Sequence, residues 1–423
     1  MPDCPESVNP PHLRWNYAIH VLDGGLYMGS QAVLNANTVL TTAIAAFGGP
    51  AWLIALMPSM MVLGVCGMPV FTAHRLDRLT RSMPLLLTTG VCQRIPLLVI
   101  GLVLLRYPDQ PALLCAVLAI GHLVSGICCG IGLPAWLELL SHTVPPRRRS
   151  SVFANRYLIG SGMGLAGGWL VKRTLEDHPG AAGYGILHLW AFGILVLSYL
   201  FFAALRETPR KAQPEHTHLS LLANLREMPG LVARYPQFGI YLAISALANG
   251  AMFIAPFLAL HSLKVLGKSD SYVGIFVAAQ MVGGVCGNVL SGWLGDRRGG
   301  KLVLVVSQGA LMATVLAAFA ARIPIICWLA FFGLGFVLGT RKVGSSTLLL
   351  EVVPAERRST ALAVAGLVQV GSLLACSGLS ALLWARGGLT PLVGMALVAA
   401  ALTLRRLTRL RDPRHLDAVA RTV

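Results

Sequence analysis

The feature that most constrains this chain is a succession of long apolar segments that begins near residue 15 and ends near residue 404. Each segment reaches or approaches the roughly 20 residues that an α-helix needs to cross a bilayer core. The segments lack the period-two alternation of membrane strands, so helices must satisfy their backbone groups. Twelve segments can be placed, at residues 15–46, 50–72, 84–105, 111–140, 151–171, 184–205, 237–263, 271–293, 302–321, 323–350, 360–385 and 389–404.

The composition agrees with a membrane protein and excludes an ordinary soluble domain. Of the 423 residues, 55% are hydrophobic and 12% are charged, whereas a soluble domain carries about 25% charged residues. The N-terminal sequence MPDCPESVNPPHLR lacks the charged region, short apolar core and cleavage site of a signal peptide, so we expect the first segment to be retained. The predicted fold class is an all-α membrane protein with twelve transmembrane helices.

The distribution of Lys and Arg predicts the orientation in the membrane. If the N-terminus is cytoplasmic, the cytoplasmic segments hold 23 of the 34 Lys and Arg residues, the outer loops hold 7, and 4 lie inside apolar segments. This bias is the positive-inside signal. It also accounts for the net charge of +17 without nucleic acid, because basic side chains bind anionic lipid headgroups. We expect a multi-pass protein of a bacterial inner membrane with both termini in the cytoplasm.

The chain contains a weak internal repeat. VPPRRRSSVFA (Val144–Ala154) and VPAERRSTALA (Val353–Ala363) are identical at six of eleven positions, and GVCG at Gly64–Gly67 recurs at Gly284–Gly287. Two copies of a six-helix unit predict two pseudo-symmetric bundles with a substrate site between them near the midplane. The predicted divisions are an N-terminal bundle (1–206), a cytoplasmic central loop (207–236), a C-terminal bundle (237–404) and a basic cytoplasmic tail (405–423).

A loop motif lies between the eighth and ninth segments, where Gly292–Lys301 reads GWLGDRRGGK. It resembles the motif Gly-x-x-x-Asp-Arg-x-Gly-Arg-Arg/Lys of the major facilitator superfamily of secondary transporters, with Gly300 in place of one Arg. The resemblance implies alternating access by two bundles and a cytoplasmic latch. The latch residues that it implies are Gly292, Asp296, Arg297, Gly299 and Lys301, with Asp77 and Arg78 in a first-half copy that has lost both glycines.

The fifth segment contains a run of glycines, Gly160-Ser-Gly-Met-Gly164-Leu-Ala-Gly167-Gly168. It is similar to the Gly-Pro-x-x-Gly-Gly pattern of drug–proton antiporters, but the proline is missing. The fourth-segment Arg of those antiporters is also missing, since residues 111–142 contain no Lys or Arg. The interpretation that we favour is close helix packing, which small residues permit.

A polar stripe marks the first segment, because His20, Asp23, Tyr27 and Gln31 follow one another at steps of three or four. A charge at the centre of a membrane helix costs on the order of 3 kcal/mol on insertion scales, so the stripe must face protein or water. One hypothesis makes Asp23 a proton or substrate-cation site with His20 sharing the proton, since burial disfavours a charged carboxylate. The alternative is a structural salt bridge from Asp23 to a basic residue. Gly24 and Gly25 are expected to soften this helix.

Four cations lie inside apolar segments. Arg94 suits a structural pair with Asp23 or a backbone carbonyl as well as it suits a function, and Arg156 is placed to extend toward the cytoplasm. Arg341 and Lys342 lie deeper, and adjacent residues diverge by about 100° on a helix, so only one of them is expected to face the cavity squarely. The excess of positive charge favours an anionic substrate. Further cavity-wall candidates are His122, Asn249, Gln280 and Gln369.

These features predict a secondary transporter, coupled to protons, for a small polar and anionic solute or metal chelate. Two alternatives stay open: proton-driven efflux of lipophilic or cationic compounds, and a transporter-like assembly factor or sensor that does not transport. No Walker loop and no catalytic constellation occur in the sequence, so we expect no enzyme, no cofactor and no resident metal. The expected partners are a solute, protons and anionic lipid headgroups, and we expect a monomer.

Overall fold

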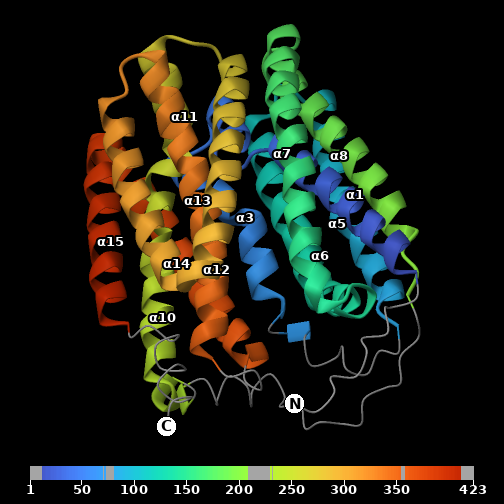
Figure 1. Ribbon diagram of the computed structural model, residues 1–423. Helices are drawn as coiled ribbons and strands as arrows, with labels where there is room; N and C mark the ends of the chain where they lie inside the picture. The colour runs from blue at the N-terminus through green and yellow to red at the C-terminus, as the bar shows by residue number, and fades with distance from the viewer. Residues whose placement is uncertain are drawn as a thin grey trace, which may run out of the picture.

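The computed structural model describes residues 12–69, 71–72, 81–207, 229–230, 232–353 and 358–410. Within these residues the chain is helical with short connections and contains no strand (Figure 1). Asp77 and Arg78, the predicted first-half latch residues, lie outside the described residues.

The first half contains six membrane crossings. Their helices are α1 (Leu13–Val33) with α2 (Val39–Ala46), α3 (Ala51–Gly67), α5 (Met83–Arg106), α6 (Pro111–Thr143), α7 (Pro146–Asp177) and α8 (Ala181–Ala203). The first segment, expected to be one helix over 15–46, is broken between Val33 and Val39. The backbone N–H of Asn37 donates to the side chain of Asn35 in this turn, a local bond that competes with helical pairing.

The second half contains the other six crossings. Its helices are α10 (Pro236–Leu247), a 3₁₀ turn η1 (Ala248–Gly250), α11 (Ala251–Leu266), η2 (Asp270–Tyr272), α12 (Val273–Ala320), α13 (Pro324–Val352), α14 (Arg358–Gly387) and α15 (Leu389–Arg409). The long element α12 holds two crossings, since Gly299 interrupts it with φ 83° and ψ 169°. Glycine adopts this positive φ without steric penalty.

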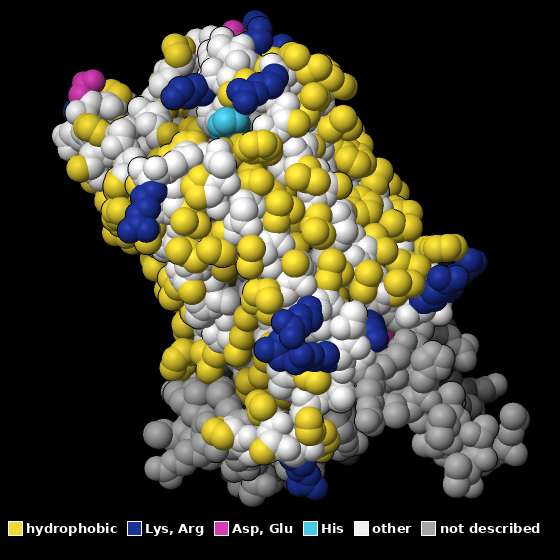
Figure 2. Space-filling view, turned by 90° about the vertical axis from the view of Figure 1, so that its left-hand side faces the viewer, with side chains coloured by type: hydrophobic (Ala, Val, Ile, Leu, Met, Phe, Trp, Pro, Cys, Tyr) yellow, Lys and Arg dark blue, Asp and Glu magenta, His cyan; other side chains and the backbone are white. Residues whose placement is uncertain are grey.

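The twelve predicted crossings are confirmed. In the described residues, eight helices are long and apolar enough to cross a membrane, and one of them, at 270–320, contains the two crossings on either side of Gly299. The remaining crossings are α1 with α2, α3 and α7. An even number of crossings brings residues 13 and 409 to the same end of the molecule, here called the inner end; the opposite end is called the outer end. The face seen in Figure 2 agrees with a lipid environment, because hydrophobic side chains cover much of it and Lys and Arg interrupt it only in scattered groups.

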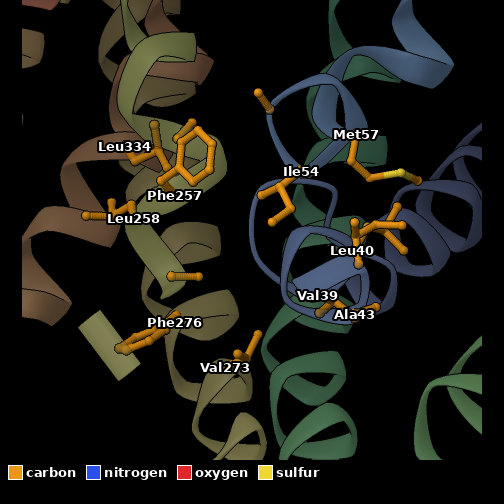
Figure 3. Packing of buried hydrophobic residues seen from close by; sticks show 14 of the residues in the cluster. Val39, Leu40, Ala43, Ile54, Met57, Phe257, Leu258, Val273, Phe276 and Leu334 are labelled. Carbon is orange, nitrogen blue, oxygen red and sulfur yellow. The ribbon is translucent and has the colours of Figure 1, made fainter. Parts of the chain in front are cut away.

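The two halves share one hydrophobic core at the outer end. There Leu40, Ile54 and Met57 of the first half belong to the same buried cluster as Phe257 and Phe276 of the second half (Figure 3). Toward the inner end the buried clusters are separate. One cluster, around Phe238 and Leu348, contains only second-half residues, and two further clusters contain only first-half residues. The described residues therefore join the halves at the outer end and keep their cores apart at the inner end.

Contacts between single residues close the outer end further. The hydroxyl of Tyr184 in α8 donates to a carboxylate oxygen of Asp270 in η2, at 3.1 Å. Below this contact α7 crosses α12 at two glycines: a methyl group added to Gly168 would lie 2.6 Å from the carbonyl oxygen of Gly274. A methyl group on Gly164 would meet Met281 of α12 at 2.7 Å. The glycine run thus allows close packing of α7, as the sequence indicated.

Candidate functional site

The acid of the polar stripe is buried inside the first half. Asp23 is 6% exposed, and one carboxylate oxygen accepts a hydrogen bond from the hydroxyl of Ser198 in α8 at 2.6 Å. The other oxygen lies 3.9 Å from a guanidinium nitrogen of Arg156 in α7. The salt-bridge geometry that the sequence left open is therefore present. Because both charges are removed from water, each depends on the other for compensation.

The sequence suggested that Arg156 extends toward the cytoplasm, but in the structure its side chain stays inside the first half. Its side chain is 7% exposed, donates to the backbone carbonyl of His20 at 3.2 Å and lies 4.8 Å from the ring centre of Trp136. The guanidinium packs directly over Gly24, where any Cβ would collide with it. Gly24 therefore serves the close approach of Arg156, and α1 runs on through Gly24 and Gly25 without interruption.

His20 bonds to a different helix from Asp23. Its Nε2 lies 2.9 Å from the hydroxyl of Thr143 in α6, and that hydroxyl donates to the carbonyl of Leu139 at 2.7 Å. Since the threonine proton is already committed, Nε2–H must be the donor and Nδ1 carries the lone pair. Nδ1 is buried and has no partner among the described residues. His20 therefore lies beside the acid site without bonding to the Asp23 carboxylate.

Tyr27 and Arg94 complete the polar interior of the first half. The side-chain amide of Gln93 donates to the hydroxyl of Tyr27 at 3.0 Å. Arg94 donates to the carbonyls of Leu195 at 2.8 Å and Gly90 at 2.7 Å. The backbone-carbonyl alternative considered for Arg94 is the one observed. Arg94 and Arg156 are therefore both held inside the first half, and neither belongs to the lining of the cavity between the halves.

His122, predicted to line the cavity, is instead buried between α6 and α8. Its Nε2 lies 3.3 Å from Nε2 of His188, and Nδ1 of His188 donates to the carbonyl of Tyr184 at 2.7 Å. His188 Nε2 is then an acceptor, so His122 must be the donor of the pair. His122 therefore forms a hydrogen bond between α6 and α8, as polar residues in membrane helices commonly do.

A cavity of about 260 Å³ lies between the two halves. Its wall comes from α1 and α7 on one side and from α12 and α13 on the other. Three of the predicted residues, Gln31, Gln280 and Lys342, line it. The side-chain oxygen of Gln280 is buried and has no partner among the described residues. Such an unpaired buried acceptor is unusual and marks a place for a ligand or water.

The sequence analysis missed three further polar lining residues, Tyr157, Ser161 and Asn288. Lys342 lies 5.4 Å from the ring centre of Tyr157, so this contact crosses from one half to the other. A usable signal was present, because Tyr157 and Ser161 are spaced by four residues beside Gly160, and Gln280, Gly284 and Asn288 repeat at the same spacing. Such a spacing places residues on one helix face.

Arg341, Asn249 and Gln369 form a second polar cluster, inside the second half. A guanidinium nitrogen of Arg341 donates to the side-chain oxygen of Asn249 at 2.5 Å. The amide of Gln369 donates to the same oxygen at 3.1 Å, and the Asn249 amide donates to Ser372 at 2.6 Å. Arg341 and Lys342 therefore point to different surroundings, as the 100° step between neighbours requires, and Lys342 is the one in the cavity lining.

The latch motif makes its observed contacts within the second half. Lys301 donates to the carbonyl of Leu410 at 2.7 Å, and Arg297 lies 4.5 Å from the ring centre of Trp293. Gly299 forms the reversal, whereas a Cβ on Gly292 would meet only open space, so Gly292 is not required for close packing. Asp296 also makes an interaction, and a closing role for the motif stays a prediction.

Two carboxylates that the sequence analysis did not single out occupy helix starts near the inner end. Glu351 accepts from the N–H of Gly300 at 3.2 Å. Glu207 accepts from the N–H groups of Ser82 and Met83 at 2.7 and 3.0 Å, where α5 begins. The N-terminus of a helix carries partial positive charge and free N–H groups, which favour a carboxylate. The signal was hidden because each acid is distant in sequence from the helix that it caps.

Comparison with solved structures shows which proteins share this fold. The fold matches a crystal structure of the nucleoside transporter NupG with a TM-score of 0.68 and 13% identity, over 93% of this chain and 98% of that one. It matches a bacterial homologue of the human lysosomal transporter Spinster (TM-score 0.63, 16% identity, 95% and 98% covered), solved inward-facing and unoccupied. A POT family transporter in complex with 5-aminolevulinic acid gives a TM-score of 0.66 at 12% identity, with 96% of each chain covered. At these identities the likeness concerns the fold, which this chain shares with the three matched membrane transporters.

A sequence comparison adds a family match for the second half of the chain. Residues 238–421 match the family model of the Major Facilitator Superfamily, while no curated protein matches the chain. The second half therefore matches this family in sequence, as the loop motif indicated, and the fold of the whole chain is similar to that of the transporters above. The match defines no subfamily.

Proposed function

We propose that this protein is a secondary transporter that moves a small polar, anionic solute through the cavity between its halves by alternating access. The observation that supports this best is the cavity wall. Both halves contribute polar groups to it, and Lys342 is the charged residue in its described lining. One cation among amide, hydroxyl and phenol groups favours a solute with one negative charge and hydrogen-bonding groups.

The arrangement of cores supports an alternating mechanism. The halves share a core at the outer end, whereas toward the inner end the described clusters belong to one half or the other. In this proposal the conformation is the one in which the cavity opens toward the inner end. Rocking of the halves would separate the outer contacts, including the bond between Tyr184 and Asp270, and bring the inner ends together.

Proton coupling runs through Asp23 in this proposal. Protonation would remove the negative charge beside Arg156, which is 3.9 Å away, and leave the guanidinium without its counter-charge. The position of Arg156 is linked to the cavity because the next residue, Tyr157, lines it. Protonation of Asp23 would thus be transmitted to the cavity through two adjacent residues of α7, Arg156 and Tyr157.

The proposal includes the setting of the protein, a monomer in a bacterial inner membrane with both termini cytoplasmic. The concentration of Lys and Arg near that end supports the orientation. The divisions at residues 206, 236 and 404 belong to the same proposal. Two of the matched structures concern a nucleoside transporter and a complex with 5-aminolevulinic acid, and both names support a small polar solute.

The test is proton flux in proteoliposomes that contain a pH-sensitive dye. Gradients of organic acids, sugar phosphates, metal chelates, amines and lipophilic cations are applied in turn to wild type and Asp23→Asn. Anion-driven proton movement that Asp23→Asn abolishes supports the proposal. Movement driven only by amines or lipophilic cations would replace it with the efflux alternative, and no flux with any class would favour a non-transporting role.

A further inference from the structure

Arg341 differs from Arg94 and Arg156 in the groups that balance its positive charge. Arg156 lies beside Asp23, and Arg94 donates to two backbone carbonyls. In the described residues Arg341 has no carboxylate within ion-pair distance and one hydrogen bond, to the neutral side chain of Asn249. Arg341 is half-buried, and its Nε is buried with no partner among the described residues. A donor that is removed from water and left unpaired is costly unless something else accepts from it.

The surroundings of Arg341 do not supply a counter-charge. Its electrostatic neighbours are Cys66 of α3, Cys376 of α14 and Tyr241 of α10. Thiols and phenols are ordinarily neutral at pH 7. The polar cluster itself belongs to the second half, but its neighbour Cys66 belongs to the first. It therefore lies at the contact between the halves, one residue along α13 from the cavity-lining Lys342.

The hydrogen bonds of the cluster fix which edge of the guanidinium is available. Nη1 is engaged by Asn249, and Asn249 is itself held by Gln369 and Ser372. In the described part of the chain neither Nε nor Nη2 has a hydrogen bond. These two parallel donors share one edge and are spaced to match the two oxygens of a carboxylate. Asn249 and its partners thus act as a support that orients this edge.

We propose that Arg341 is the anchor for a carboxylate group of the transported solute, bound in a two-point contact to the Nε–Nη2 edge. This inference rests on the proposed transport function and adds the ligand's chemical class and its anchor. Lys342, the next residue along α13, lines the cavity and takes no part in this two-point contact. A carboxylate fits this edge better than an uncharged amide of the same shape, because only the carboxylate both accepts two bonds and neutralises the charge.

The experiment compares carboxylates with their amides on the purified full-length protein in detergent. The probes are acetate and acetamide, benzoate and benzamide, and succinate and succinamide, and the readout is the thermal midpoint as a function of probe concentration. In wild type we expect at least one carboxylate to bind tenfold or more tightly than its amide. Arg341→Lys, which keeps the charge and loses the planar fork, should lose this preference, whereas the same change at the exposed Arg173, which pairs with Asp177, should retain it.

Asn249→Asp guards against a variant that merely fails to fold. It keeps the shape of Asn249 and its bond to Arg341 but adds an internal counter-charge, so the protein should be at least as stable as wild type while carboxylate preference disappears. The proposal is overturned if no carboxylate binds more tightly than its amide in wild type, or if Arg341→Lys or a folded Asn249→Asp keeps the preference.

Measurement of proton flux distinguishes a failure of the carboxylate anchor from a failure of the proposed transport function. Carboxylate-driven flux that persists in Arg341→Lys removes the anchor and leaves transport standing, whereas Arg341-dependent binding without flux removes transport and leaves the anchor.

Discussion

Asp23 and Arg156 face each other across α1 and α7 at 3.9 Å, with side chains that are 9% and 8% exposed. Removal of one partner from such a pair leaves the other charge buried and uncompensated, at a cost of about 3–5 kcal/mol. We expect Asp23→Asn and Arg156→Gln each to lower the free energy of unfolding by an amount in this range. The double variant should cost less than the two single changes together. Chemical denaturation in detergent measures all four proteins, and additive losses would contradict a direct coupling.

The same pair predicts a pH effect on transport. Asp23→Asn fixes the site in a form equivalent to the protonated one, so the flux of the carried solute should lose its dependence on the pH gradient. Asp270→Asn is the matched control, since Asp270 bonds to Tyr184 at the outer end and not to an arginine in the described residues. A coupled flux that survives in Asp23→Asn, or that disappears equally in Asp270→Asn, would argue against Asp23 as the proton site.

Gly24 should tolerate no side chain. A Cβ at this position collides with the guanidinium of Arg156, and overpacking of this kind costs roughly 1–3 kcal/mol. Gly24→Ala should therefore lower the thermal midpoint. Gly162→Ala on α7 is the control, because a Cβ there meets nothing within 4 Å and replacement of a helical glycine by alanine is favourable by up to about 1 kcal/mol. Equal behaviour of the two variants would disprove this account.

The hydroxyl of Tyr184 should hold the outer end closed. Tyr184→Phe removes its bond to Asp270 and should shift the population toward conformations that are open at the outer end. Pairs of spin labels at residues 181 and 268 would report longer distances across this contact. Tyr272→Phe deletes a hydroxyl that accepts from Trp328 within the second half and should leave the distances unchanged.

Glu207 should stabilise the start of α5. Its carboxylate accepts from two backbone N–H groups, and loss of a helix N-cap typically costs about 1 kcal/mol. We expect Glu207→Ala to lower the thermal midpoint measurably. Glu176→Ala removes a largely exposed pair with Lys172 and should have almost no effect. A silent Glu207→Ala would show that water replaces the cap without cost.

Lys342 should determine the charge preference of the cavity. Lys342→Gln removes the charged side chain from the described lining and should reduce uptake of the anionic solute, whereas Lys342→Arg should largely preserve it. Initial rates of anion-driven flux in proteoliposomes provide the comparison. Unchanged rates in Lys342→Gln would mean that the cavity does not select anions through this residue.

The sequence was sufficient to predict the crossings because their signal is local. The length of each apolar segment, the Lys and Arg residues of each loop and the motif at Gly292–Lys301 can each be recognised in a short stretch of sequence. The prediction of the first segment failed, because hydropathy does not show where a helix is interrupted. The segment 15–46 was expected to be one helix, but a side-chain bond at Asn35 accompanies a break that hydropathy does not register.

The candidate site was harder to predict than the fold, because a polar residue in a membrane helix has several ways to find a partner. Arg94, Arg156 and His122 found theirs within the first half, while Gln31, Gln280 and Lys342 reached the cavity. Helical periodicity places a residue on a face, but tertiary packing decides what that face meets. Glu207 and Glu351 show the same limit, since each stabilises a helix far from it in sequence.

The core shared by the two halves at the outer end has a thermodynamic consequence. Opening that end requires Leu40, Ile54 and Phe257 to give up part of their common apolar contact, and exposure of apolar surface to water raises the heat capacity. Opening toward the inner end separates clusters that already belong to different halves. The outward step should therefore carry the larger heat-capacity change, and it would give the turnover rate a curved dependence on temperature wherever that step limits the cycle.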